Sequence, residues 1–316
     1  MSSCGFKGQQ KAIGYAYAGL SSVNLRGELG VGAATTATIE HGERLEILET
    51  RRRFVRVRTK QGAEGWTDST YLLTQVQMDD LVRLADRAAS LPSQGVATVF
   101  DTLNIHTGTS RDAPSFAQIV EGEQIDVVAH RASERELPSG EKSADDWFLV
   151  RTKEHRAGWV LSRMLLMSIP DEIAQYANGH YITAYHALNS EGTSWLWATS
   201  EHARQEFDFD GLRVFVYNAR KKSYETVYKE SNLRGYYPVE QQGTSFSAVM
   251  VEKDGSLAKR VYSFNGAKVK LLSKEPWQRP AALPDVNVPK TFDTTPPKED
   301  NWASKVRGFT EWWFGI

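Results

Sequence analysis

The stretch GAEGWTDSTYL, Gly62–Leu72, places a Gly-Trp pair after a charged run and then ends on a polar turn and Tyr-Leu. A second stretch, HRAGWVLSRML at His155–Leu165, has Gly158–Trp159 in the place of Gly65–Trp66. One Gly-Trp pair says little about a fold. Two copies indicate an internal repeat, and such a repeat would decide the architecture of the chain.

The spacing within the two copies supports a repeat. Asn24–Gly42 is as long as Asn104–Gly122, and Val57–Trp66 is as long as Val150–Trp159. Between these matched segments the second copy carries extra residues, which fall in the charged, turn-rich stretch Arg131–Asp146. A surface hairpin loop tolerates such an insertion. We therefore interpret the segments as two copies of one unit, with a longer hairpin loop in the second.

Each copy is predicted to be a small all-β unit. RLEILE and FVRVRT alternate apolar and polar residues, which predicts a buried face formed by Leu45, Ile47, Val55 and Val57. Gly42 and Gly122 stand between strand patterns, where a turn can require positive φ. We expect Trp66 and Trp159 to be core residues, because a single large aromatic can close a small core.

Both copies resemble the bacterial SH3-type (SH3b) domain. The shared features are an apolar-Asn-apolar opening, a central Gly, an aromatic-x-x-Val-Arg strand, Gly-Trp and a final Tyr-Leu. The second copy departs from the pattern at His106, where Arg is usual, and at Met164–Leu165 in place of Tyr-Leu. The resemblance implies SH3-like β-barrels that bind peptides, often cell-wall peptides or glycans. Together with sequence segments nearer the C-terminus, such as RVFVYN, this resemblance also implies similarity to a group of bacterial envelope proteins.

Five residues are candidates for ligand binding. Phe54, Tyr71 and Trp147 are expected to line a groove, since Phe54 and Trp147 alternate away from the apolar face and recognition surfaces favour aromatics. Packing against a neighbouring domain is the alternative. Arg56 and Arg58 are expected on the solvent side, where they would contact an anionic group or simply form a solvated hairpin.

The rest of the chain predicts two helices and a sheet. Met78–Pro92 has helical spacing, and Ser168–Ala177 begins with a capping residue and an early Pro170. Strand patterns fill Tyr181–Leu272, with hairpin signals at Asp254-Gly255 and Asn265-Gly266. We therefore predict a mainly β fold, with two small SH3-like β-barrels, an antiparallel meander domain and short connecting helices.

The predicted domain boundaries follow from these patterns. They are an N-terminal tether at 1–20, the first SH3b-like domain at 21–75, a helical linker at 76–94, the second SH3b-like domain at 95–168, a C-terminal antiparallel β domain at 169–275, and a Pro-rich linker with an aromatic tail at 276–316.

Composition and charge exclude several classes of function and site. The 316 residues carry a net charge of −1, so a general attraction to nucleic acid is not expected. No apolar run is long enough to span a membrane. Because Cys4 is the only cysteine, an intrachain disulfide and a Cys-rich zinc site are both excluded. We expect no cofactor.

The sequence contains no strong catalytic motif. Neither Gly-x-Ser-x-Gly nor His-Glu-x-x-His occurs. His180, His186 and His202 could approach one another, but ordinary surface histidines explain them better than a metal site. Asp208 and Asp210, which precede a glycine, are interpreted as turn residues. We therefore assign no catalytic and no metal-ligating residue.

Both ends of the chain carry a specific signal. MSSC resembles the lipobox of bacterial lipoproteins, so we expect Cys4 to be lipidated after removal of a signal peptide that this sequence lacks. The location would then be the periplasmic side of the envelope, or the cytoplasm if Met1 is the true start. The tail carries an apolar stripe that would dock on the chain's own β domain, a partner or a membrane, formed by Trp302, Val306, Phe309, Trp313 and Ile316.

The sequence therefore favours a non-catalytic binding or scaffold protein of the bacterial envelope. Its partner would be a cell-wall peptide or glycan, or an envelope protein. The alternative is an envelope hydrolase or carbohydrate-active enzyme with its active site in the C-terminal β domain. A convergent polar cluster in a deep pocket would favour the enzyme, and a shallow aromatic groove on a barrel would favour binding.

Overall fold

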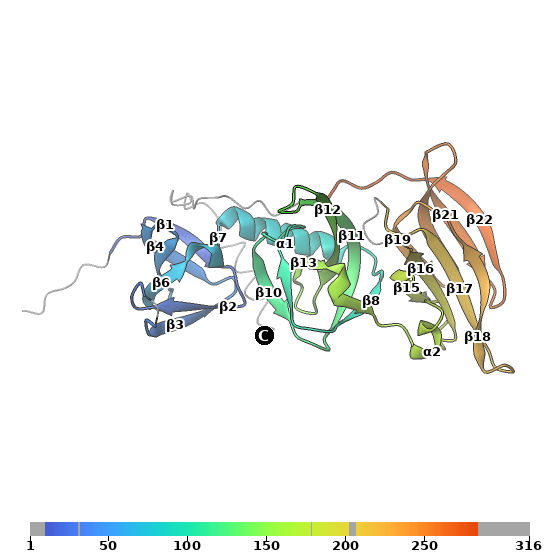
Figure 1. Cartoon of the computed structure of the whole chain (residues 1–316), viewed down its shortest axis with the longest axis horizontal. Helices are drawn as coiled ribbons and strands as arrows, with labels where there is room; N and C mark the ends of the chain where they lie inside the picture. The colour runs from blue at the N-terminus through green and yellow to red at the C-terminus, as the bar shows by residue number, and fades with distance from the viewer. Residues whose placement is uncertain (1–9, 31, 178, 202–206, 284–316) are drawn as a thin grey trace, which may run out of the picture. The chain divides into compact units, whose positions relative to one another are not determined.

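The computed structural model describes residues 10–30, 32–177, 179–201 and 207–283 (Figure 1). The fold is mainly β, as the sequence predicts, and its sheets are antiparallel. The described residues divide into two compact units, one within 10–82 and 112–117, the other within 83–111 and 118–283. We call residues 14–73 the first repeat, 95–167 the second repeat and 169–276 the C-terminal β domain.

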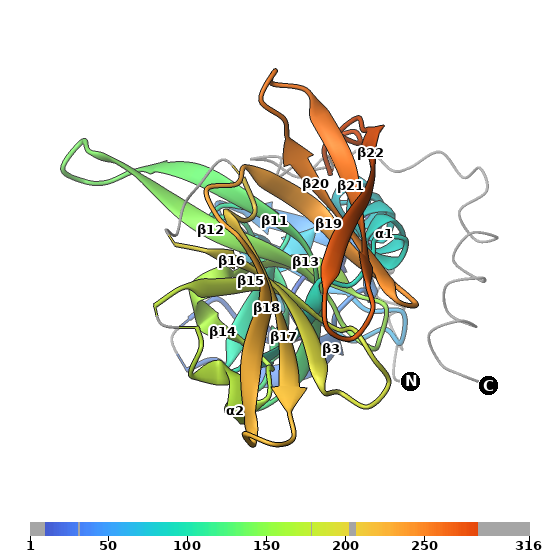
Figure 2. The ribbon, with the colours of Figure 1, turned by 90° about the vertical axis from the view of Figure 1, so that its right-hand side faces the viewer.

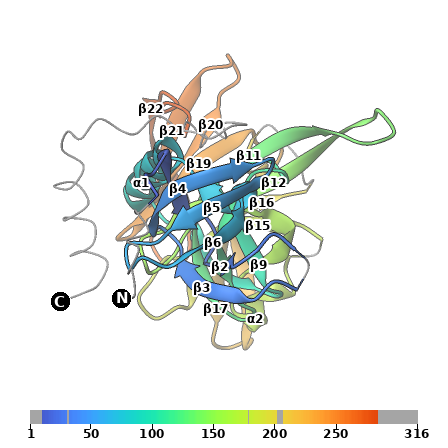
Figure 3. The same ribbon diagram turned by 90° about the vertical axis from the view of Figure 1, so that its left-hand side faces the viewer.

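The first repeat is a seven-stranded antiparallel sheet with the order β3-β2-β6-β5-β4-β1-β7 (Figure 3). Its elements are β1 (Gly14–Ala18), β2 (Ser22–Arg26), β3 (Thr35–Glu40), β4 (Arg44–Arg51), β5 (Phe54–Arg58), β6 (Glu64–Asp68), a 3₁₀ turn η1 (Ser69–Tyr71) and β7 (Leu72–Leu73). The predicted face is confirmed, since Leu45, Ile47, Val55 and Val57 are buried in one core. The expected tether at 1–20 is wrong over β1, because Ala16 and Ala18 are buried in that core and β1 pairs with β4.

The second repeat has the equivalent strand order, β10-β9-β13-β12-β11-β8-β14. Its elements are β8 (Gly95–Val99), β9 (Leu103–His106), β10 (Ser115–Ile119), β11 (Gln124–Glu136), β12 (Lys142–Arg151), β13 (Ala157–Leu161), a 3₁₀ turn η2 (Ser162–Met164) and β14 (Leu165–Met167). The matching order confirms the internal repeat. The extra residues of Arg131–Asp146 do not form a loop, because most of them lengthen β11 and β12 into a long hairpin (Figure 2).

The two Gly-Trp strands occupy equivalent positions. Trp66 on β6 lies between Arg26 of β2 and Arg56 of β5, and Trp159 on β13 lies between β9 and β12 in the same way. Trp66 is 8% exposed and Trp159 is fully buried, which confirms both as core residues. The turns that begin the matched strands β4 and β11 also agree, with φ of 84° at Gly42 and 80° at Gly122.

Helix α1 (Gln75–Ala89) confirms the helix predicted at Met78–Pro92. Its residues Leu84 and Ala88 are buried against Trp147 and Trp159 of the second repeat. The second predicted helix is reduced to one turn, α2 (Asp171–Ala174). Among the described residues, no helix has both the length and the apolar character needed to cross a membrane.

The C-terminal β domain consists of two four-stranded meanders, β15-β16-β17-β18 and β19-β20-β21-β22 (Figure 1). The strands are β15 (Tyr181–Ala187), β16 (Ser194–Ser200), β17 (Gly211–Asn218), β18 (Ser223–Glu230), β19 (Gly235–Gln242), β20 (Ser245–Val251), β21 (Leu257–Phe264) and β22 (Val269–Pro276). Both sheets contribute to one core, for example through Leu196 and Phe246. The two predicted Gly turns are confirmed, with φ of 85° at Gly255 and 87° at Gly266.

Gln94 joins the second repeat to the C-terminal β domain. Its carbonyl accepts the Tyr185 backbone N–H at 2.9 Å, and its side-chain Oε1 accepts the Val239 backbone N–H at 2.9 Å. Gln94 is fully buried. A buried amide with satisfied partners fixes geometry, because each partner would be costly to leave unbonded. The two parts therefore form one framework on which a shared site can be built.

Replacement of Gly65 by Ala should destabilise the first repeat. A Cβ at Gly65 would lie 2.7 Å from the Leu25 Cβ and 3.0 Å from the Arg26 carbonyl oxygen. Overpacking of this kind costs about 1–3 kcal/mol. Hydrogen exchange of β2 and β6 should therefore accelerate in Gly65→Ala. Gly30→Ala is the control, since nothing lies within 4 Å of its added Cβ. Equal exchange in the two variants would contradict this packing.

Candidate functional site

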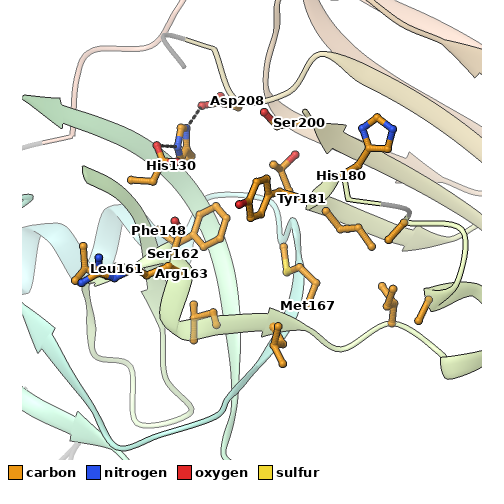
Figure 4. Close-up of a pocket in the computed structure, with 18 of the residues that line it drawn as sticks. His130, Phe148, Leu161, Ser162, Arg163, Met167, His180, Tyr181, Ser200 and Asp208 are labelled. Carbon is orange, nitrogen blue, oxygen red and sulfur yellow. Dashed lines mark hydrogen bonds and ion pairs between the residues drawn. The ribbon is translucent and has the colours of Figure 1, made fainter. Parts of the chain in front are cut away.

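A cavity of about 660 Å³ lies between the second repeat and the C-terminal β domain (Figure 4). The second repeat supplies its lining from β11, β12, η2 and β14, and the C-terminal domain supplies α2, β15, the end of β16 and residues 207–208. Most of the wall is apolar, including Phe148, Leu165, Met167 and Ile182. This size and character are typical of a small-molecule site.

His130 stands at one end of the cavity between two carboxylates. Its Nδ1 lies 2.7 Å from Asp208 Oδ1, and its Nε2 lies 3.1 Å from Asp146 Oδ1. The His130 side chain is 10% exposed and each aspartate side chain is 14% exposed. Figure 4 shows the imidazole pointing toward Asp208. Because β11 carries His130 and Asp208 precedes β17, this contact joins the second repeat to the C-terminal domain.

The two carboxylates hold His130 in its protonated form. Burial lowers the pKa of His130, but the hydrogen bonds and negative charges of Asp146 and Asp208 outweigh it and raise the pKa to about 9. A protonated imidazole donates from both nitrogens and cannot accept a proton. Within the described residues, the hydrogen-bond partners of His130 are these two aspartates alone. His130 is therefore a buried cation at neutral pH and not a general base.

Tyr237 and Thr183 extend this polar end. The Tyr237 backbone N–H donates to Asp208 Oδ2 at 2.7 Å, and the Tyr237 hydroxyl donates to the Thr183 carbonyl. Burial, followed by the charge of Asp208, raises the pKa of Tyr237 well above its ordinary value. Thr183 is among the residues that line the cavity, and it is 8% exposed. Charge and burial are thus concentrated around Asp208.

His180, which also lines the cavity, stands well apart from His130 in Figure 4. Its Nε2 lies 2.7 Å from Arg213 Nη2. A guanidinium can only donate, so Nε2 must accept and Nδ1 must carry the proton. His186 lies further along β15, where burial lowers its pKa. His202 is outside the described residues. The part of the chain that the structure describes holds no group of three or more His, Cys, Asp and Glu arranged to bind a metal ion.

Trp147 does not face a groove, and the expectation that it does is wrong. It is fully buried, its indole N–H donates to Ser133 Oγ at 3.0 Å, and its ring meets His106 edge-on. The reason is that α1 covers the second face of β12, so that four consecutive residues, Trp147–Val150, are all buried. Alternation identifies an exposed face only when one side of a strand meets solvent.

Arg58 is also not on the solvent side. Its side chain is 7% exposed and bonds Glu64 at 2.8 Å and Glu46 at 2.9 Å. Arg56 bonds the same Glu64 at 2.9 Å and is 36% exposed. The strand register places these carboxylates directly opposite or diagonal to the two arginines. These two arginines are therefore largely neutralised by cross-strand pairing.

Tyr71 and Phe54 remain accessible on the first repeat. Tyr71 is 45% exposed in η1, and Phe54 is half-buried beneath the Arg53 guanidinium, whose carbon lies 5.0 Å from the ring centroid. Their binding role stays a prediction. Cys4 and the tail stripe of 302–316 lie outside the described residues.

No sequence motif marks the residues that build the cavity's polar end. The sequence predicts a turn at Asp208, which does precede β17, but its carboxylate also binds His130 and Tyr237. His130 and Asp146 stand at the margins of the insertion, where no motif marks them. Asp210 does cap locally, since it accepts the Glu201 backbone N–H at 2.9 Å. The tandem aspartates before Gly211 are the one sequence signal that pointed here.

Comparison with known proteins leaves the family open. No family model and no curated protein matches this chain. NlpC2 from Trichomonas vaginalis is 12% identical over 86% of this chain and 100% of that chain, with a TM-score of 0.18. An NlpC/P60 family protein from Bacillus cereus is 10% identical over 84% and 95%, with a TM-score of 0.21. TM-scores this low carry no argument about fold or function.

Stability should fall between pH 6.5 and 9 because of His130. Its folded pKa of about 9 exceeds the ordinary value of 6.5, so its contribution is complete below pH 6.5 and is lost as the pH rises to 9. The shift corresponds to about 3 kcal/mol. The midpoint of urea unfolding, measured at several pH values, should lose this component in His130→Gln. His155→Asn, at an exposed turn residue, should keep it. An unchanged pH profile in His130→Gln would contradict the assignment.

Proposed function

We propose that this protein is a non-catalytic binding or scaffold protein of the bacterial cell envelope. Its partner is a cell-wall peptide or glycan, or an envelope protein, as the SH3b resemblance of the two repeats implies. In this proposal the cavity between the second repeat and the C-terminal β domain is the ligand site. Attachment through Cys4 is the proposed route to the envelope.

The observation that carries the proposal is a pre-formed cavity in which the buried imidazole of His130 already bonds two carboxylates. The volume of about 660 Å³ and the mostly apolar wall suit a ligand. His130 bonds both aspartates, which keeps the polar end in one arrangement. Rigid polar groups on an apolar wall favour binding, because little ordering is needed when a ligand enters.

A hydrolase is the second candidate, since a convergent polar cluster in a pocket is the feature that would favour an enzyme. His130, Asp146 and Ser200 do line one cavity. Acyl transfer, however, needs a base whose nitrogen can accept a proton from a nucleophile. Both His130 nitrogens donate to carboxylates at neutral pH. The cluster therefore supports binding more than hydrolysis.

Filling the cavity should abolish binding. Ala177 lines the cavity, so Ala177→Trp should remove retention on intact peptidoglycan sacculi, or capture of the envelope partner from a membrane extract. Ala267→Trp is the matched control, because Ala267 is an exposed turn residue of the same unit. Retention is measured by co-sedimentation and capture by pull-down with the purified full chain.

The outcomes separate the candidates. Loss of binding in Ala177→Trp with retention in Ala267→Trp supports the cavity as the ligand site. Equal binding of both variants excludes the cavity. Release of soluble fragments from sacculi by the wild type, lost in His130→Gln, would establish the hydrolase instead.

The exposed aromatics of the first repeat are a second proposed contact surface. Tyr71 is 45% exposed and Phe54 is half-buried, so truncation of either should leave the core intact. If they are central to an interface, Phe54→Ala and Tyr71→Ala should each weaken partner capture by about 2 kcal/mol or more. Val76→Ala, at another exposed apolar residue, is the control. Unchanged affinity in folded Phe54→Ala and Tyr71→Ala proteins would place the contact elsewhere.

A further inference from the structure

The segment that follows β22 crosses from the C-terminal β domain to the second repeat. Its first residue, Trp277, donates its backbone N–H to the Leu257 carbonyl of β21 at 3.0 Å. Its last described residue, Leu283, packs against the apolar cluster of α1 and the second repeat. The Leu283 carbonyl accepts a hydrogen bond from Arg131 Nη2 at 2.9 Å. We call residues 277–283 the arm.

The arm contacts the face of β11 and β12 that is turned away from the cavity. Arg131 lies opposite Trp147 in the strand register, and His130 lies opposite Phe148. Cross-strand partners share a face, and successive residues of a strand point to opposite faces. His130 and Phe148 line the cavity, while Trp147 belongs to the cluster of α1. The arm and the cavity therefore use two different surfaces of the second repeat.

Apolar packing and a charge-assisted hydrogen bond hold Leu283 on this face. The cluster against which it packs includes Leu84 and Ala88 of α1 and Trp159 of β13, all fully buried. The Arg131 guanidinium carbon lies 4.6 Å from the centroid of the Trp159 ring, so one guanidinium contacts both the indole and the arm. Cation–π contacts and hydrogen bonds from a charged donor are among the stronger contacts that a side chain makes. We call this surface the α1 face.

The first repeat forms the same arginine–tryptophan contact, but its arginine has a different partner. Arg51 on β4 and Trp66 on β6 occupy the strands equivalent to β11 and β13, and the guanidinium carbon lies 5.2 Å from the ring centroid. Arg51 Nε bonds Glu49 at 2.6 Å, and 62% of the arginine side chain is exposed. The barrel thus makes this contact with the arginine bonded within its own sheet. The arm is an addition to the second repeat, in the position of a ligand.

The arm has the sequence of an extended apolar peptide. It reads WQRPAAL, and Pro284 follows it in the sequence. A residue before proline is biased toward extended backbone, and this applies to Arg279 and Leu283. The Arg279 guanidinium carbon also lies 4.0 Å from the centroid of the Tyr236 ring, so the middle of the arm rests on β19. A segment biased in this way loses little conformational freedom when it docks.

We propose that the α1 face of the second repeat is a docking site for an extended, apolar, proline-containing peptide, and that the arm is its internal ligand. The leucine side chain enters the apolar cluster, and the leucine carbonyl binds Arg131. A partner peptide of the same kind must displace the arm before it can bind. This inference goes beyond the proposed function, because it assigns a second, self-masked peptide site that does not depend on the cavity.

The first measurement asks whether Leu283 holds the arm. Leu283→Asp in the full chain puts a charge against the apolar cluster and should free the arm. Elastase cleavage between Ala281 and Ala282, mapped by mass spectrometry, should then accelerate at least about tenfold. Leu272→Asp is the matched control, because Leu272 is 57% exposed on β22 and should leave the cleavage rate unchanged. Leu283→Ala, a milder truncation, should show a smaller acceleration.

The second measurement supplies the arm in trans. A blocked synthetic peptide with the sequence of residues 277–285 is titrated calorimetrically into each full-length protein. A tethered arm competes at an effective concentration on the order of millimolar, so wild type should bind the peptide at least about tenfold more weakly than Leu283→Asp. Adding Arg131→Gln to Leu283→Asp should lower the peptide affinity about tenfold, because the charged donor is lost. A peptide that itself carries Leu283→Asp should not bind.

Faster cleavage together with tighter peptide binding, in Leu283→Asp and not in Leu272→Asp, supports the proposal. Faster cleavage without any peptide binding overturns the docking site and leaves the arm as ordinary packing. Equal cleavage of wild type and both Leu283 variants overturns the internal ligand. Equal peptide binding by wild type, Leu283→Asp and the double variant places the peptide elsewhere and also overturns the proposal. The role of the cavity is decided separately, by Ala177→Trp.

Discussion

The contact of His130 with Asp146 and Asp208 is the interaction on which the site depends. The His130–Asp208 hydrogen bond of 2.7 Å ties the β11–β12 hairpin to the C-terminal β domain in a largely buried setting, and the His130–Asp146 contact of 3.1 Å lies within the hairpin. Loss of the imidazolium would leave two carboxylates facing each other out of water, which is strongly unfavourable. The same contact keeps both imidazole nitrogens bonded to carboxylates.

The cavity borders the longer hairpin of the second repeat. Both repeats share their strand order, but the extra residues lengthen β11 and β12 only in the second. Asp146 lies at the end of that insertion, and His130 comes directly before it. The longer hairpin of the second repeat therefore carries this polar edge. In the first repeat, Arg56 and Arg58 form cross-strand pairs with Glu64 and Glu46.

Burial on both faces explains why the second repeat can support a neighbour. Helix α1 covers one side of β12 at Trp147, while Phe148 on the other side lines the cavity. A strand held from two sides is rigid, and a cavity wall built on it keeps its shape. Gln94, directly before β8, accepts the backbone N–H groups of Tyr185 on β15 and Val239 on β19, one through its carbonyl and the other through its side chain. The cavity wall is therefore fixed by packing within the chain itself.

The sequence by itself determined the features that depend on local rules. Alternation identified the core face with Leu45 and Val57, matched spacing identified the repeat, and glycine at positive φ identified the turns at Gly42 and Gly122. The tertiary structure alone decided the burial of Trp147 and the pairing of His130 with Asp208, which are 78 residues apart. Periodicity reports how a strand alternates. It does not report which element covers each face, and the contacts between distant elements made this site.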